Sequence, residues 1–165
     1  MNYKTVFEIT EKGLDITSFV PLIMFIAIVL IIILNNKFNP EKLKKKMPFL
    51  IVLSIIFFIV AICVLAFTFE QRNKINKVYQ EKSFSVVCGE IKDFQPAIFK
   101  GKKEDEHFTV NDVYFEYNDY EQVYGFNNSS TLGGPIYGNG QEVRISYIPE
   151  KKYNRILKVE IKVGD

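Results

Sequence analysis

The sequence predicts a membrane-anchored α+β protein, in which a two-helix transmembrane hairpin is followed by a small all-β domain, OB-like or another small barrel. Three observations support this class. Two long apolar blocks lie before Glu70, a lysine-rich connector separates them, and alternating apolar and polar residues follow from Phe84 onward. A chain of 165 residues has room for one modest domain and its accessory segments.

Residues 1–15 are expected to form an N-terminal tail. This stretch carries Glu8, Glu11 and Asp15, whereas a secretory signal begins with basic residues. The apolar block that follows ends in Leu-Asn-Asn and not in the small residues of a cleavage site. We therefore expect the first helix to be retained.

Residues 16–34 and 49–69 are predicted to be transmembrane helices. Neither block contains a charged side chain, and each is close to the roughly 20 apolar residues that span a hydrocarbon core. The alternative is a pair of buried core helices. A helix of a small soluble protein has a polar face, but residues 28–34 are apolar on every side, which favours the membrane.

The connector, residues 35–48, predicts the orientation of the hairpin. It contains one acid, Glu41, and five lysines: Lys37, Lys42, Lys44, Lys45 and Lys46. Short lysine-rich loops stay in the cytoplasm, so both termini and the β domain are expected outside it, at a bacterial inner membrane. The basic residues between Arg72 and Lys82 favour the opposite orientation.

Residues 70–82 are polar and lack Gly and Pro, so they are expected to continue the second helix as a stalk or spacer. The β domain is assigned to residues 83–165. Its first strand, near residues 83–94, places Phe84, Val86 and Cys88 on one face, with a bulge at Gly89. Cys88 is expected to be a small core residue.

A β-hairpin is predicted within residues 107–117. If Asn111 and Asp112 form a two-residue turn, Val110 faces Val113 and Phe108 faces Phe115. Alternation predicts two more strands, at residues 142–148 and 157–163. Five short strands favour a closed or nearly closed barrel, because closure removes exposed edges.

The order of four segments, GEIKDFQP, FTVNDVYFEYND, GFNNSSTLGGPIYGNGQEVRISY and ILKVEI, resembles a family of small bacterial membrane proteins with a C-terminal β domain. The shared pattern is FxVxxxxFxY, then GFN, GGPI and VRIxY, and it covers about half of the chain. The resemblance implies the helix-then-sheet order. It implies no activity, substrate or catalytic residue.

The glycine-rich stretch from Gly125 to Gln141 is the candidate binding loop. Asn139-Gly140 is typical of a hairpin turn, but the segment before it contains more residues than such a turn needs. A structural Ω-type loop, a ligand or partner site and a catalytic loop all remain open. The ligand or partner hypothesis names Phe126, Asn127, Asn128, Ser129, Ser130, Thr131, Gly133 and Gly134, whose N–H and hydroxyl groups suit an anion.

The chain offers little for catalysis. It has one histidine, His107, and two cysteines, Cys63 and Cys88, and we expect neither a catalytic residue nor a metal site nor a cofactor. From Ser83 onward, ten Lys or Arg stand against thirteen Asp or Glu, a net charge of −3 that argues against nucleic acid.

These observations favour a binding or assembly module of the bacterial inner membrane, and not an enzyme. Its expected partners are the lipid bilayer and a protein, either another chain or a second copy. The alternative is a β-barrel ligand sensor that controls the membrane helices, with the Gly125–Gln141 loop at the mouth of its pocket. The sequence does not identify the ligand.

Overall fold

A computed structural model describes residues 2–11, 16–38, 46–98, 104–120, 124–151 and 153–164. The chain divides into two compact units. The first comprises residues Met1–Lys12 and Lys74–Asp165, and the second comprises Gly13–Asn73. Because the second unit lies within the sequence of the first, it is an insertion in the β unit.

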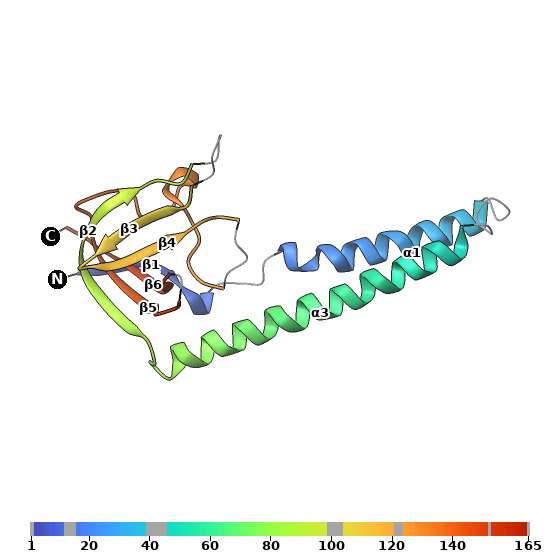
Figure 1. The fold of residues 1–165 in the computed structure, drawn as a ribbon, viewed down its shortest axis with the longest axis horizontal. Coiled ribbons are helices and arrows are strands. Elements are labelled where there is room, and N and C mark those ends of the chain that lie inside the picture. The colour runs from blue at the N-terminus through green and yellow to red at the C-terminus, as the bar shows by residue number, and fades with distance from the viewer. Residues whose placement is uncertain are drawn as a thin grey trace. The chain divides into compact units, whose positions relative to one another are not determined.

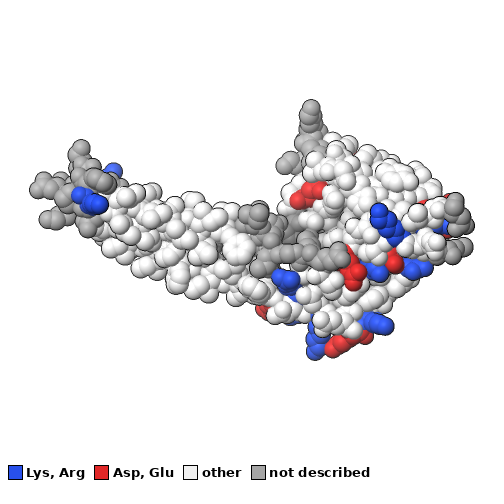
Figure 2. All heavy atoms as spheres, turned by 180° about the vertical axis from the view of Figure 1, so that it is seen from behind, with Lys and Arg blue, Asp and Glu red and all other residues white. Residues whose placement is uncertain are grey.

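The inserted unit is a pair of antiparallel helices preceded by a 3₁₀ turn, Ile16–Phe19 (Figure 1). Helix α1 spans Val20–Phe38, and α3 begins at Met47 and continues to Gln80. The rings of Phe25 and Phe58 lie 5.1 Å apart and join the two helices. Figure 2 shows a long uncharged stretch on the hairpin surface.

Helix α3 is long and apolar enough to cross a membrane, while the apolar part of α1, Val20–Leu34, is shorter. Both helices expose large apolar side chains, including Leu30 on α1 and Phe67 on α3. Ala61 and Ser54 are buried, so the small side chains of α3 are used within the hairpin. The α+β class is confirmed.

The β unit is a six-stranded antiparallel sheet with the order β1-β6-β5-β2-β3-β4 (Figure 1). The strands are β1 (Tyr3–Glu8), β2 (Ser85–Gln95), β3 (Glu106–Val110), β4 (Val113–Tyr117), β5 (Glu142–Ile148) and β6 (Arg155–Lys162). The predicted hairpin is confirmed in its register. Val110 pairs with Val113 and Phe108 with Phe115, and both turn residues have positive φ.

The sheet is open, so the prediction of a closed barrel is wrong. β1 and β4 are its edges and are not paired with each other. Both edges are blunted in ways that discourage pairing with another chain. β1 has a register shift between Thr5 and Phe7, and Asn154 Nδ2 donates to the outer carbonyl of Tyr114 at 2.8 Å. These features protect the two edge strands from pairing with another chain, which is the role that closure into a barrel would have had.

The first predicted strand exists, but its faces are reversed. Val87 and Ile91 are buried, whereas Val86 and Cys88 are exposed. The register with β5 runs without a shift through Gly89, and the irregularity lies between Lys92 and Gln95. Gly89 has a different purpose: a Cβ there would lie 3.0 Å from the Asn111 amide, which donates to the Cys88 carbonyl.

The N-terminal segment is a strand and not a tail. β1 pairs with β6 from Tyr3↔Lys162 to Glu8↔Lys158. A 3₁₀ turn, Ile9–Glu11, then leads toward the apolar hairpin. The sheet is therefore built from both flanks of that hairpin, and residues 83–165 alone omit one edge strand.

Two apolar clusters hold the β unit together. The larger one contains Phe108, Phe115, Phe126 and Val143, with residues from β2 and β6. The smaller one is formed by Ile9, Ile75 and Leu157. Since Ile75 belongs to the last turns of α3, the segment expected to be a spacer packs against the sheet instead.

Candidate functional site

The candidate loop is anchored in the β unit at both ends. Phe126 is 5 % exposed, and its ring lies 4.9 Å from that of Tyr117 and 5.2 Å from that of Phe7. At the other end, Asn139 Oδ1 accepts from Phe94 N, and Gly140 N donates to the Ile91 carbonyl. Phe126 is therefore a core residue and is not available to a ligand.

The middle of the loop binds a carboxylate of the same chain. Glu106, the first residue of β3, is fully buried. Ser130 donates to Glu106 Oε2 from its N–H at 2.9 Å and from its hydroxyl at 2.5 Å. The Tyr117 hydroxyl donates to Glu106 Oε1 at 2.5 Å. These donors replace the water that a buried carboxylate loses.

Asp119 holds the neighbouring residue of the loop. Its Oδ1 accepts from Ser129 N at 3.0 Å. Its Oδ2 and Ser129 Oγ are buried and have no hydrogen-bond partner among the described residues. Two oxygens are fewer than the six to eight that Ca²⁺ takes. The described residues contain no group of three or more potential metal ligands.

The two central glycines close the loop on itself. Gly133 N donates to the Ser130 carbonyl and Gly134 N to the Ser129 carbonyl. Thr131 Oγ1 donates to the Ala97 carbonyl at 3.0 Å, which ties the loop to the segment that follows β2. The N–H groups of Ser129, Ser130, Gly133 and Gly134 are thus occupied within the protein, and the carboxylate bound by Ser130 is that of Glu106.

Glycine at position 134 is required by a close approach of the backbone. A Cβ there would lie 2.1 Å from the Asn128 carbonyl oxygen. We expect Gly134→Ala to destabilise the β unit by about 1–3 kcal/mol, the usual range for overpacking. Denaturant unfolding followed by tyrosine fluorescence measures this change.

Gly138→Ala is the matched control, because a Cβ at Gly138 meets no atom within 4 Å. Equal unfolding midpoints for Gly134→Ala and Gly138→Ala would show that the loop tolerates the displacement of Asn128.

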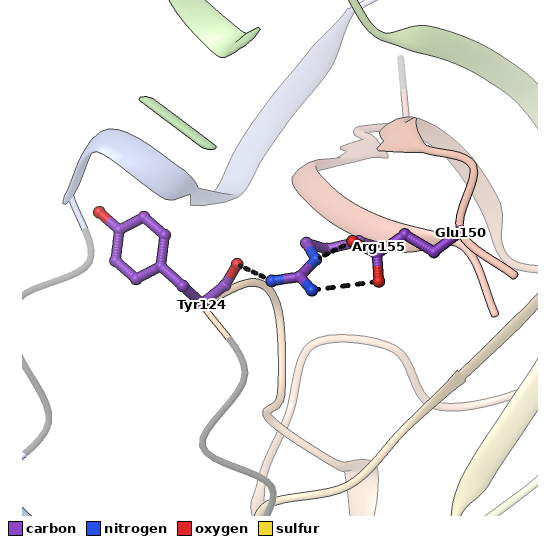
Figure 3. A network of polar contacts seen from close by, with 3 residues as sticks. All are labelled: Tyr124, Glu150 and Arg155. Carbon is purple, nitrogen blue, oxygen red and sulfur yellow. Dashed lines mark hydrogen bonds and ion pairs between the residues drawn. The ribbon is translucent and has the colours of Figure 1, made fainter. Parts of the chain in front are cut away.

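A small pocket lies beside the first part of the loop. It is lined by Glu116, Tyr117, Asn118, Gly125, Phe126, Asn127, Tyr153, Asn154, Arg155 and Ile156. The volume is about 20 Å³, enough for a single water molecule. Arg155 donates to both Glu150 oxygens, at 2.6 and 3.1 Å, and to the Tyr124 carbonyl at 3.3 Å (Figure 3). These contacts orient the guanidinium within the protein.

The remaining candidate residues do not converge. His107 Nδ1 lies 3.2 Å from the Asp105 carbonyl, and its ring lies 5.8 Å from the ring of Tyr114. Asn128 is exposed, and Cys88 and Cys63 lie in different units.

Three tyrosines resist ionisation. Burial, followed by the hydrogen bond to Glu8, raises the pKa of Tyr79 to about 12. Burial and then the charge of Glu106 raise the pKa of Tyr117 well above its usual value. Burial and then the hydrogen bond to Glu116 raise the pKa of Tyr114. Each folded-state pKa is therefore higher than that of the unfolded chain.

We expect the stability of the β unit to fall above about pH 10. Below this pH the tyrosines are protonated in both states. Above it the unfolded chain releases protons that the folded chain retains, so unfolding is favoured. Unfolding midpoints between pH 8 and 11.5 test this expectation, with Tyr117→Phe expected to weaken the pH dependence. A wild-type midpoint that is constant over this range contradicts it.

The sequence hypothesis missed Glu106, although its position contained a signal. Glu106 shares the parity of Phe108 and Val110, so alternation places it on the buried face. The surrounding run of charges, KKEDEHF, hides this signal, because such a run is more typical of a solvated loop than of a buried strand.

The chain was compared with family models, curated proteins and solved structures, and none of them matches.

Proposed function

We propose that this protein is a bacterial inner-membrane protein whose two apolar helices hold the β unit at the membrane surface as a binding or assembly module. The observation that carries the proposal is the pairing of β1 with β6. Paired strands lie on one side of a membrane, so the chain between them crosses an even number of times. If α3 crosses once, then α1 supplies the second crossing.

The exposed apolar side chains of the hairpin support this arrangement. In water, faces that carry Ile23, Leu30, Ile55 and Phe67 would favour aggregation. In lipid the same faces are solvated, and both helices satisfy their backbone hydrogen bonds internally. The lysine-rich connector supports a cytoplasmic position for the turn and an outer position for the β unit.

A binding role is supported by the fixed shape of the loop. Leu132 and Tyr137 are 63 % and 71 % exposed, on a loop whose neighbouring residues are fixed by Glu106 and Gln141. Exposed apolar side chains on an ordered backbone bind a protein partner with little loss of conformational entropy. The partner is another envelope protein or a second copy of this chain.

A non-catalytic role is favoured because the charged side chains near the loop bind other groups of the protein. The carboxylates of Glu106 and Asp119 hold backbone and side-chain groups of the loop, and Arg155 is bound to Glu150. The ligand-sensor alternative requires a cavity, and the pocket beside Arg155 holds about one water molecule.

Site-specific photocrosslinking in intact cells tests the binding role. A photoreactive phenylalanine analogue at Tyr137 is expected to give a discrete crosslinked product. The same analogue at Asp112, in the turn between β3 and β4, is the matched control and is expected to give none. Equal and diffuse labelling from both positions contradicts a binding role for this loop.

A further inference from the structure

The two segments that flank the apolar hairpin meet at one place on the β unit. We call this place the seat and define it by Ile9, Ile75 and Leu157, which are 0 %, 7 % and 0 % exposed. Ile9 follows β1, Ile75 lies in the last turns of α3, and Leu157 lies on β6. Three elements thus contribute one buried side chain each.

Polar contacts reinforce the seat. The Tyr79 hydroxyl donates to Glu8 Oε1 at 2.9 Å, which links α3 directly to the end of β1. The Tyr124 hydroxyl lies 3.3 Å from the Ile9 carbonyl oxygen and 3.4 Å from Asn76 Oδ1. Because this hydroxyl has one proton, it donates to either acceptor or is shared between them. Tyr124 therefore bridges the same two segments.

The packing around the seat makes these contacts interdependent. The Tyr79 ring stacks on Phe84 with centroids 5.3 Å apart, and both rings pack against the buried cluster. If Ile75 leaves, Ile9 and Leu157 lose their apolar cover and Glu8 loses the Tyr79 hydroxyl. β1 is then held by its ladder to β6, by the packing of Phe7 on Phe126 and by Arg144 over the Tyr3 ring.

We propose that the seat is a latch that couples the docking of β1 to the docking of the α3 end. Release of the last turns of α3 releases β1, and the outer edge of β6 then becomes free to pair with another strand. This inference goes beyond the proposed function, because it does not depend on the membrane or on a partner. It assigns β1 the role of a removable cover for a sheet edge.

Hydrogen exchange on the full-length protein in lipid nanodiscs tests the latch. Ile75→Ala removes a side chain that contributes nothing to the β1–β6 ladder. The latch predicts at least tenfold faster exchange of the amides in residues 3–8, with unchanged exchange in β3 and β4. Tyr79→Phe, which removes only the hydroxyl, is expected to have the same effect with a smaller magnitude.

Lys77→Ala is the matched control, since the Lys77 side chain is 74 % exposed on the same helical turns. Coupling between two sites is reciprocal. Lys4→Pro weakens the β1 ladder far from the seat, so it is expected to speed exchange in residues 74–80, whereas Lys4→Ala is not. Faster exchange confined to residues 74–80 in Ile75→Ala, or equal acceleration throughout the β unit, overturns the proposal.

Discussion

A fragment comprising residues 83–165 is expected to fold with lower stability than residues 1–12 joined by a Gly/Ser linker to residues 74–165. The fragment lacks β1 and exposes Leu157 together with one edge of β6. Burial of a large aliphatic side chain contributes about 1.5–3 kcal/mol. Exposure of Leu157, which loses its contacts with Ile9 and Ile75, is therefore expected to lower the stability of the fragment by about 1.5–3 kcal/mol.

Circular dichroism and urea unfolding of the two proteins measure this difference. The linked protein is expected to unfold cooperatively and to remain soluble, because it lacks the apolar residues 13–73. A linked protein with Ile9→Asp is the control for the seat and is expected to be destabilised. Cooperative unfolding of residues 83–165 at the midpoint of the linked protein contradicts the assignment of β1 to the sheet.

Glu106→Ala is expected to destabilise the β unit strongly, since a buried donor left without an acceptor costs about 1–3 kcal/mol. The affected donors are the Ser130 N–H, the Ser130 hydroxyl and the Tyr117 hydroxyl. Glu106→Gln keeps the side-chain shape but directs an NH₂ group at one of these donors, so it is expected to destabilise as well.

Unfolding of the linked protein measures the loss, and hydrogen exchange of residues 125–134 locates it. Glu90→Gln is the matched control, because Glu90 is an exposed carboxylate on β2 of the same sheet. If Glu106→Gln and Glu90→Gln have equal midpoints, Glu106 does not hold the loop.

The strands that sequence alternation predicted correctly are those whose neighbours lie close in the chain. The Asn111-Asp112 turn fixes the register of β3 and β4, because two positive φ angles allow few other geometries. Local chemistry and burial agree in this hairpin. β5 and β6 were also predicted, but a register shift follows Ser146 on β5, and Ile156 and Leu157 on β6 are buried in different clusters.

Strand β1 was not predicted because the strand with which it pairs lies far away in the sequence. Its partner β6 lies about 150 residues further along the chain. The register shift between Thr5 and Phe7 also breaks the alternation within a strand of six residues. In the same way, the last turns of α3 look like a polar spacer until Ile75 and Tyr79 are seen to face Leu157 and Glu8.

The hydrogen bonds between the Gly125–Gln141 loop and Glu106 were not predicted from the sequence. Its composition indicates donors for an anion, and composition does not distinguish an external anion from Glu106. The side chain of Glu106 is 24 positions away from that of Ser130 and reaches it only after β3 has formed. Which carboxylate the loop contacts is therefore decided by the tertiary structure.

We propose that the hairpin between β1 and β2 crosses the membrane twice, so that β1 joins the rest of the sheet on one side. Cysteine accessibility in spheroplasts tests it most directly, with Cys63 and Cys88 replaced by Ser and single cysteines at Lys4, Lys44 or Leu132. The account predicts that an impermeant thiol reagent labels Lys4→Cys and Leu132→Cys on the outer side, and Lys44→Cys only after permeabilisation. Labelling of Lys4→Cys and Leu132→Cys from opposite sides would contradict the account.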